Sequence, residues 1–180
     1  MTDRALILVD IQNDYFDGGL WPVDQMAQVA QTAAAVLDRA RAAGDLVIHV
    51  HHEAGSETAP FFRPGTQGAD IHSSVAPQDG EATVLKHRPN SFHDTDLHAR
   101  LQAAGVTKVT IVGAMTQMCI DATARAARDL GYEVTLVADA CGAKSIAYGD
   151  TKLTAEQVQA AFMAPLSMSY GKVVMAADLD

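Results

Sequence analysis

The chain has 180 residues, of which 48% are hydrophobic and 19% are charged, a composition typical of a folded globular domain. Its 13 basic and 22 acidic residues give a formal net charge of −9 at pH 7, which repels nucleic acids and anionic membrane surfaces and excludes both as expected partners. The two cysteines, Cys119 and Cys141, are too few for a dense disulfide framework, so each is expected to be a free thiol.

Apolar runs typical of strands alternate along the chain with amphipathic runs typical of helices. In chain order, the predicted elements are a strand at 5–10, a helix at 23–44, strands at 45–52 and 83–88, a helix at 94–105, a strand at 108–114, a helix at 117–131, a strand at 132–140, a helix at 154–166 that Pro165 interrupts or ends, and a strand at 172–176. This alternation predicts an α/β fold: a doubly wound, mostly parallel sheet with helices on both faces.

The length predicts one domain that spans residues 1–180. No apolar run approaches the roughly 18 to 20 residues needed to cross a bilayer. The first residues, MTDRALILVDIQ, lack the basic, apolar and small-residue regions of a secretory signal, so we expect a cytoplasmic protein. Residues 53–82 have no periodic pattern and are expected to form a long loop that walls the ligand site.

Three reactive side chains follow strands of the predicted sheet. Asp10 ends the run ALILVD, Lys86 follows TVL, and Cys119 lies in the first turn of the helix after KVTIVGA. Ligands of open parallel sheets bind at the carboxyl ends of the strands, where these side chains would meet. A helix N-terminus and a nearby ammonium both favour a thiolate, and a carboxylate can accept the thiol proton and pass it to a leaving amine.

Each of the three residues also has a purely structural explanation. A single cysteine is often a small buried hydrophobe, an aspartate at a strand end often caps a turn, and a lysine there is usually solvated. The coincidence of all three at strand ends is what favours catalysis.

The chain resembles the isochorismatase-like cysteine hydrolases, which include nicotinamidases and carbamoyl-amide amidases. The resemblance is carried by LVDIQNDYF at 8–16, LKHRPNSF at 85–92 and IVGAMTQMCIDATARAARDLGYEVTLVADAC at 111–141. It implies a catalytic triad of Asp10, Lys86 and Cys119, in which the thiolate attacks an amide carbonyl, ammonia or an amine leaves, and water resolves the thioester. It also implies a cis peptide bond between Ala114 and Met115 and an oxyanion hole formed by the N–H groups of Met115 and Cys119.

Two departures from the family narrow the expected chemistry. True isochorismatases, which cleave a vinyl ether, lack the nucleophilic cysteine, so Cys119 points to an amide-like or carbamoyl-like substrate. Nicotinamidases hold a metal on an Asp-x-His pair after the second strand and on histidines of the next loop. Here the stretch reads HVHHEAGS, and Phe61 occupies the place of a ligand histidine. We therefore expect neither a metal nor another cofactor.

Other residues near the predicted site have competing explanations. His49, His51, His52 and His72 could form a different metal site, but no cysteine or aspartate lies beside them at ligand spacing, which favours core or loop roles. Cys141 is expected to pack as a small residue rather than to act as a resolving thiol. Tyr15 and Phe61 flank the site and are candidate substrate contacts, because small-molecule pockets are mostly apolar.

The sequence therefore predicts a cysteine-dependent hydrolase of the carbon–nitrogen bond of a small amide. The alternatives are isochorismatase-type hydrolysis and a non-catalytic small-molecule binding protein on the same fold. The expected partner is the small-molecule substrate. The apolar helix at 23–43, and the resemblance to a family whose members commonly form oligomers, favour a homo-oligomer.

Overall fold

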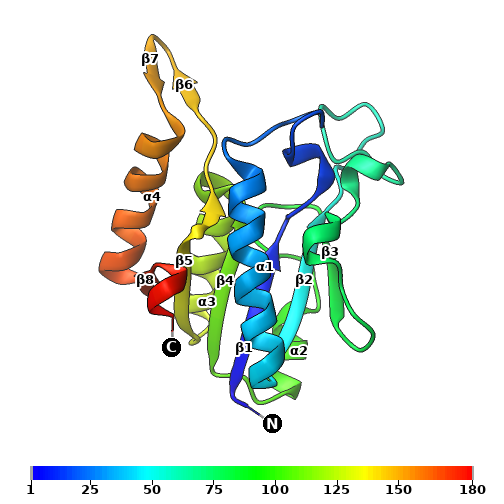
Figure 1. Ribbon diagram of the computed structural model, residues 1–180, viewed down its shortest axis with the longest axis vertical. Helices are drawn as coiled ribbons and strands as arrows, with labels where there is room; N and C mark the ends of the chain where they lie inside the picture. The colour runs from blue at the N-terminus through cyan, green and yellow to red at the C-terminus, as the bar shows by residue number, and fades with distance from the viewer. Residues whose placement is uncertain (1, 180) are drawn as a thin grey trace.

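The computed structural model describes residues 2–179 and has the predicted α/β architecture (Figure 1). Its central sheet contains six parallel strands in the order β3-β2-β1-β4-β5-β8. The strands are β1 (Arg4–Val9), β2 (Leu46–His52), β3 (Ala82–Lys86), β4 (Lys108–Ala114), β5 (Glu133–Gly142) and β8 (Lys172–Val174).

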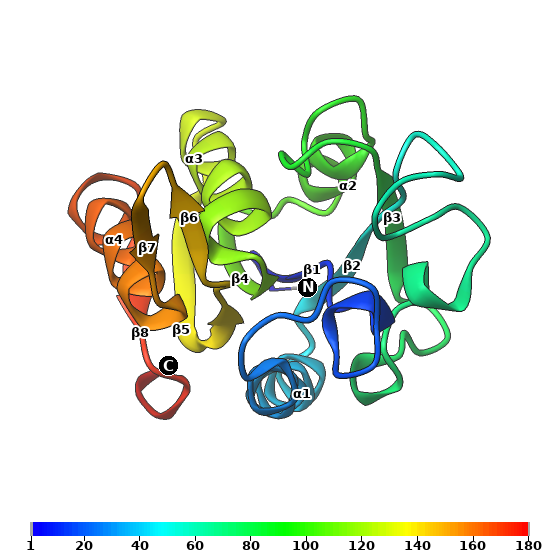
Figure 2. The ribbon, with the colours of Figure 1, turned by 90° about the horizontal axis from the view of Figure 1, so that it is seen from above.

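Four helices cover the sheet: α1 (Met26–Ala43), α2 (Leu97–Ala103), α3 (Asp121–Asp129) and α4 (Ala155–Ser169). Seen from above, α1 lies on one face, and α2 and α3 lie on the other (Figure 2). Each face has its own hydrophobic core, one built around α1 and the other around apolar residues of α2, α3 and α4. The central strand β1 is buried on both faces, as its apolar run predicts.

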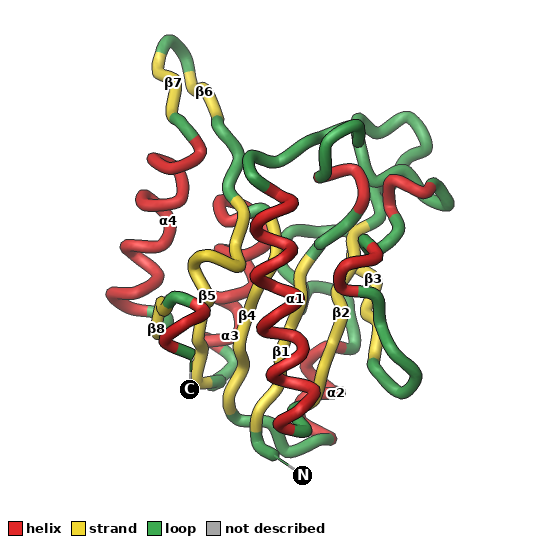
Figure 3. Tube along the Cα trace, viewed as in Figure 1, coloured by secondary structure: helices red, strands yellow, loops and turns green. Residues whose placement is uncertain are grey.

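The order of the strands reverses at β1, since the chain continues first to β2 on one side and later to β4 on the other. A switch point of this kind opens a crevice at the carboxyl ends of the strands. These ends and the long connecting loops lie at the end of the sheet opposite both termini (Figure 3). Gly113 has a φ of 129°, and a Cβ there would lie 1.9 Å from the Val9 carbonyl oxygen, so only glycine lets β4 approach β1 so closely beside the site.

Three predicted helices begin later than expected. The helix predicted at 23–44 starts at Met26, and the helix predicted at 94–105 covers only 97–103. Gln25 and Asp94 have φ angles of 54°, in the left-handed region, which a right-handed helix does not accommodate. The helix predicted at 117–131 is divided, because a π-helical turn at Thr116–Ile120 precedes α3.

The prediction that Pro165 interrupts or ends the last helix is wrong, since α4 continues through it to Ser169. A proline in a helix leaves the carbonyl of the residue four positions earlier without its partner. That residue is Ala161, which is exposed, so water can satisfy its carbonyl.

The sequence reading also missed a hairpin of β6 (Ile146–Tyr148) and β7 (Thr151–Leu153), which projects beyond the sheet (Figures 1 and 3). Its two-residue loop starts at Gly149, whose φ of 57° suits a tight hairpin turn. The long loop predicted at 53–82 ends before Ala82, where β3 begins, and contains short 3₁₀ turns at Gln67–Ala69 and Ser73–Val75. Within residues 2–179, no helix has the length and apolar character needed to span a membrane.

Candidate active site

Asp10 is the first residue after β1 and is completely buried. Its backbone has a φ of 53°, and its N–H donates to the Val50 carbonyl at 2.9 Å, which fixes the turn at the end of the strand. Its side chain lies 2.7 Å, through Oδ2, from the Nζ of Lys86. The Oδ1 atom accepts no hydrogen bond from any residue within 2–179, so this buried carboxylate keeps a free acceptor.

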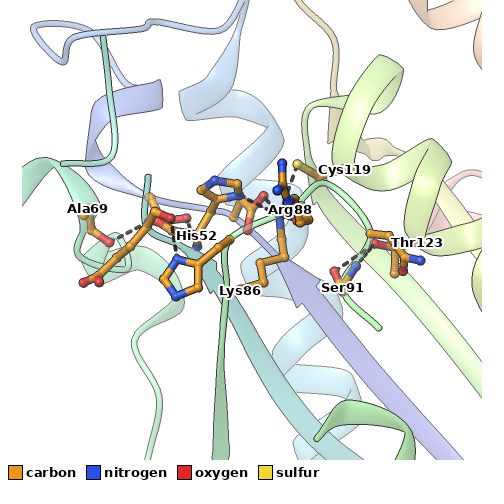
Figure 4. Close-up of polar contacts among 12 residues, drawn as sticks. His52, Ala69, Lys86, Arg88, Ser91, Cys119 and Thr123 are labelled. Atoms are coloured by element: carbon orange, nitrogen blue, oxygen red, sulfur yellow. Dashed lines mark hydrogen bonds and ion pairs between the residues drawn. The ribbon is translucent and has the colours of Figure 1, made fainter. Parts of the chain in front are cut away.

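Lys86 is the last residue of β3, and its side chain reaches past the end of β2 to the switch point. Its ammonium group contacts Asp10, and it donates to Cys119 Sγ at 3.2 Å, to His52 Nδ1 at 3.1 Å and to the Arg88 carbonyl at 3.1 Å (Figure 4). Burial lowers the pKa of Lys86, but the charges of Asp10 and Cys119 more than offset this and raise it above its ordinary value. The raised pKa favours the charged form of the lysine beside the sulfur.

Cys119 lies in the π-helical turn that leads into α3, and 5% of its surface is exposed. Burial raises the pKa of the Cys119 thiol, Asp10 raises it further, and Lys86 only partly opposes them. The ammonium favours the thiolate, as expected, because Lys86 lowers the pKa of the thiol, but desolvation is the larger effect and the net pKa is raised. A raised pKa favours the protonated sulfur, and a base has to remove that proton before the sulfur can attack.

The structure thus brings together the three predicted catalytic residues from three separate strand ends. The loop after β3 is also tied to α3, since Ser91 Oγ lies 2.8 Å from Thr123 Oγ1 and the Ser91 N–H donates to the same hydroxyl at 3.1 Å (Figure 4). Both side chains are completely buried. This contact fixes the loop that follows Lys86 against the helix that follows Cys119.

The peptide bond between Ala114 and Met115 is cis, as predicted. The Met115 carbonyl accepts from the N–H groups of Met118 and Ile120 at 3.0 and 3.2 Å, which closes the turn around Cys119. An oxyanion hole formed by the N–H groups of Met115 and Cys119 stays a prediction.

The turn before Cys119 is braced from α4, which the sequence reading did not anticipate. The buried hydroxyl of Thr116 donates to Gln159 Oε1 at 2.7 Å, and Gln159 Nε2 donates to the Ala138 carbonyl at 2.9 Å. Gln117 Nε2 donates to the Lys144 carbonyl at 3.1 Å. Two side-chain amides therefore hold the turn that contains Cys119 against β5 and the chain that follows it.

Gln12 and Asp14 are buried residues that sequence reasoning also missed. The Asp14 carboxylate accepts from the N–H groups of Leu20 at 3.1 Å and Phe62 at 2.6 Å, so it joins the loop after β1 to the long loop after β2. The signal was available in the sequence: Asp10, Gln12 and Asp14 alternate directly after an apolar strand, where polar side chains need buried partners.

The two predicted substrate contacts differ in accessibility. Tyr15 is 1% exposed and packs on Phe62 with ring centroids 4.5 Å apart, whereas Phe61 is partly exposed and stacks on Trp21 at 4.9 Å. The pKa of the Tyr15 hydroxyl is raised by burial and then by the nearby charges of Cys119 and Asp10. Phe61 is thus the better placed of the two to contact a ligand, and both roles stay predictions.

The histidines considered as metal ligands do not converge. His49 lies 2.9 Å from Glu81, and His72 Nδ1 lies 2.9 Å from the Ser74 hydroxyl. In the described part of the chain, one group of side chains is close enough together to bind a metal ion. One potential ligand atom each of Asp10, His52 and Cys119 lies within 4.8 Å of the other two. The Lys86 ammonium already contacts all three, so this group does not suit a divalent cation. The predicted lack of a metal stays a prediction.

Cys141 is buried on β5, and its sulfur lies 3.9 Å from the Ile111 carbonyl. Burial raises the pKa of its thiol to about 12. These surroundings agree with a packing role.

Comparison with known proteins gives the family. Residues 4–169 match the model of the isochorismatase domain. The uncharacterised isochorismatase family protein YddQ of Bacillus subtilis (strain 168) is 43% identical over 169 residues, which cover 94% of this chain and 94% of that protein. A streptothricin hydrolase of Streptomyces noursei is 39% identical over 139 residues, which cover 76% of this chain and 49% of that protein.

Solved structures have the same fold over almost the whole chain. A protein of Oleispira antarctica described as an isochorismatase hydrolase is 48% identical with a TM-score of 0.94, covering 97% of this chain and 94% of that one. A cysteine hydrolase of Pseudomonas syringae pv. phaseolicola 1448A is 26% identical with a TM-score of 0.92, covering 99% of this chain and 92% of that one.

Proposed function

This chain belongs to the isochorismatase family of hydrolases, and on that premise we propose that it is a cysteine-dependent hydrolase that cleaves the carbon–nitrogen bond of a small amide through a thioester. The observation that carries the proposal is the position of the Lys86 ammonium, 2.7 Å from the Asp10 carboxylate and 3.2 Å from the Cys119 sulfur. A nucleophile, a cation and a proton acceptor are in contact, and each has a separate role in acyl transfer.

In the first half-reaction, Asp10 removes the thiol proton of Cys119 as the sulfur attacks the amide carbonyl. Lys86 stabilises the negative charge that forms on the sulfur, and the N–H groups of Met115 and Cys119 donate to the oxyanion of the tetrahedral adduct. When the adduct collapses, the carbon–nitrogen bond breaks and Asp10 returns the proton to the leaving ammonia or amine. The product of this half-reaction is an acyl thioester on Cys119.

In the second half-reaction, water attacks the thioester carbonyl and gives a proton to Asp10. The carbon–sulfur bond breaks, the acid product leaves, and the sulfur of Cys119 takes the proton back from Asp10. The triad is thereby restored, and the net reaction consumes one water. The same carboxylate therefore acts as base and acid in both halves.

A small, partly apolar amide fits the surroundings. Phe61, Trp21 and Tyr15 form an aromatic group whose neighbouring ring centroids lie 4.9 and 5.9 Å apart, and Tyr15 lies in the 3₁₀ turn Asn13–Tyr15 that follows Asp10 in the chain. An apolar wall beside a few polar groups is the usual design of a small-molecule site. We propose that Phe61 and Tyr15 line the substrate pocket.

A homo-oligomer and a cytoplasmic location are also part of the proposal. From Gln157 to Ser169, α4 has no charged residue, although much of its surface is exposed. A helix face in contact with water usually carries charged side chains, so this face supports association with another copy. Light scattering of the purified chain tests the oligomer, and cell fractionation tests the location.

The function is tested by incubating the purified chain with a panel of small amides and measuring ammonia release. The wild type is expected to release ammonia from at least one amide, and Cys119→Ala is expected to release none. Hydrolysis of a vinyl ether without dependence on Cys119 would instead indicate isochorismatase-type chemistry. Binding without turnover of any substrate would indicate a non-catalytic binding protein.

A further inference from the structure

His52 is an additional member of the site that the triad does not include. It is the last residue of β2 and pairs in register with Lys86 on β3. Its Nδ1 accepts a hydrogen bond from the Lys86 ammonium at 3.1 Å (Figure 4). Because an imidazole that accepts at Nδ1 is neutral and carries its proton on Nε2, the contact requires an uncharged ring. Burial lowers the pKa of His52 to about 4, with Lys86 as the next cause, so the ring is neutral near pH 7.

The backbone of His52 is held from both sides by one buried side chain. Gln12 Oε1 accepts from the His52 N–H at 2.8 Å, and Gln12 Nε2 donates to the His52 carbonyl at 2.9 Å. The same Nε2 donates to the Ala69 carbonyl at 2.6 Å, and Gln12 is completely buried. The His52 ring also lies 6.0 Å, between centroids, from the ring of Phe62. The acceptor at Nδ1 is therefore fixed in place rather than carried on a mobile side chain.

The ammonium group of Lys86 has three N–H donors but four acceptors around it. Two of these acceptors change during the proposed reaction: Cys119 alternates between thiol, thiolate and thioester, and Asp10 gains and loses a proton. A thioester sulfur and a protonated carboxyl are both poorer acceptors than their anions. The acceptors that do not change are the Arg88 carbonyl and His52 Nδ1.

We propose that His52 is a positioning residue, whose Nδ1 keeps the Lys86 ammonium beside the Cys119 sulfur while the other partners of the ammonium change. This inference rests on the proposed function for its place in the reaction. The contact between Lys86 and the Cys119 sulfur exists before any substrate binds, so the positioning role of His52 can be tested without turnover. A misplaced lysine stabilises the thiolate less, so the sulfur becomes less reactive toward any electrophile.

The test is the rate of alkylation of Cys119 by iodoacetamide at a fixed pH near 8, followed by intact and peptide mass, which needs no substrate. Three substitutions separate the acceptor from the bulk of the ring. His52→Asn places an amide oxygen near the position of Nδ1, His52→Gln places one near Nε2, and His52→Ala removes both. His51→Asn, on the same strand, is the control for substitution in β2.

We expect His52→Ala and His52→Gln to slow alkylation of Cys119 by about 10-fold or more, the scale of a small displacement of an active-site group. His52→Asn is expected to restore most of the rate, and His51→Asn to leave it unchanged. Alkylation of Cys141 in the same samples reports folding, because a loosened chain would expose that buried thiol. With an amide substrate, the same order should appear in kcat with little change in KM.

Wild-type alkylation rates in both His52→Ala and His52→Gln would overturn the inference. Equal slowing in His52→Asn would also overturn it, because the effect would then come from the ring and not from its acceptor. If alkylation depends on His52 as expected but no amide is hydrolysed, the proposed function fails while the positioning role stands.

Discussion

The Nζ of Lys86 and the Oδ2 of Asp10 lie 2.7 Å apart, and neither side chain has any exposed surface. Removing two charges from water costs several kcal/mol for each, so a buried ion pair is not kept for stability alone. The Cys119 sulfur, 3.2 Å from the same ammonium, supplies the other reason. The pair is placed where one member can take a proton and the other can stabilise the sulfur anion.

The first prediction concerns this pair. Asp10→Asn removes the proton acceptor and Lys86→Met removes the cation, so each is expected to slow acylation of Cys119 by roughly 10²- to 10⁴-fold. Because the groups act as a unit, the double variant should be little slower than the more damaged single variant. Single-turnover kinetics with an activated amide measures all three.

Stability of the same variants provides a control. Each single change leaves one buried partner of the pair uncompensated and is expected to reduce the free energy of unfolding by about 3–5 kcal/mol, whereas the double variant should recover part of that loss. Urea denaturation measures this. If the acylation losses of the two single variants multiplied in the double variant, Asp10 and Lys86 would be acting separately.

The second prediction concerns Asp14, which joins the two loops beside the site. Asp14→Ala leaves the N–H groups of Leu20 and Phe62 without their acceptor and is expected to lower the free energy of unfolding by about 2–4 kcal/mol. Asp17→Ala, at an exposed neighbouring position, is the matched control and should change it by less than about 0.5 kcal/mol. Similar midpoints of urea unfolding for the two variants would show that Asp14 does not hold the loops.

Much of the fold could be predicted because it depends on local patterns. The apolar runs of β1, β2, β4 and β5 and the glycine after α1 are visible in the sequence, and together they predict a parallel sheet covered on both faces. Asp10 directly follows β1, Lys86 ends β3, and Cys119 lies in the helical turn that follows β4, so the sequence places all three at one edge of such a sheet. The cis bond was expected only from the resemblance to a known family.

The features of the fold and the site that the sequence did not predict depend on contacts between residues distant in sequence. The raised pKa of the Cys119 thiol reflects burial by surrounding elements, which no local pattern reveals. The contacts of Gln12 with His52 and of Gln159 with Thr116 join positions 40 and 43 residues apart. The start of α1 depends on the left-handed backbone of Gln25, and glutamine seldom adopts that conformation, so the sequence does not predict it.

The third prediction concerns acid stability. Glu81 accepts from Arg41 at 2.7 and 2.8 Å, and burial opposes the effect only in part, so the pKa of Glu81 is lowered from 4.5 to about 2. A carboxyl with a lowered pKa in the folded state contributes stability above its unfolded pKa, and this contribution is lost as pH falls through the folded pKa. The contribution of Glu81 should therefore be complete above about pH 5 and decline between pH 4.5 and 2.

Urea denaturation of the wild type and Glu81→Gln at several pH values measures this contribution. The variant is expected to be less stable by about 1–3 kcal/mol at pH 7, and the difference should shrink below pH 4.5. Glu57→Gln, at an exposed position, is the control and should be nearly neutral throughout. A difference between wild type and Glu81→Gln that did not change with pH would contradict the assignment.

The fourth prediction concerns metals. Because the Lys86 ammonium contacts Asp10, His52 and Cys119 at once, a divalent cation at that group would face a fixed positive charge. Elemental analysis of protein purified without added ions should find substoichiometric metal, and dialysis against a chelator should leave amide hydrolysis unchanged. Stoichiometric zinc, with activity lost on its removal, would refute this.

Trapping of the acyl intermediate tests the proposed cysteine chemistry most directly. An activated amide or ester is mixed with the chain, the reaction is quenched in acid within one turnover, and intact mass is measured, followed by peptide mapping. We predict one added acyl group on Cys119, none on Cys141, no adduct in Cys119→Ala, and slower formation of the adduct in Asp10→Asn and Lys86→Met. Substrate hydrolysis that continues in Cys119→Ala, or adducts that form at wild-type rates in folded Asp10→Asn and Lys86→Met, would contradict the proposed chemistry.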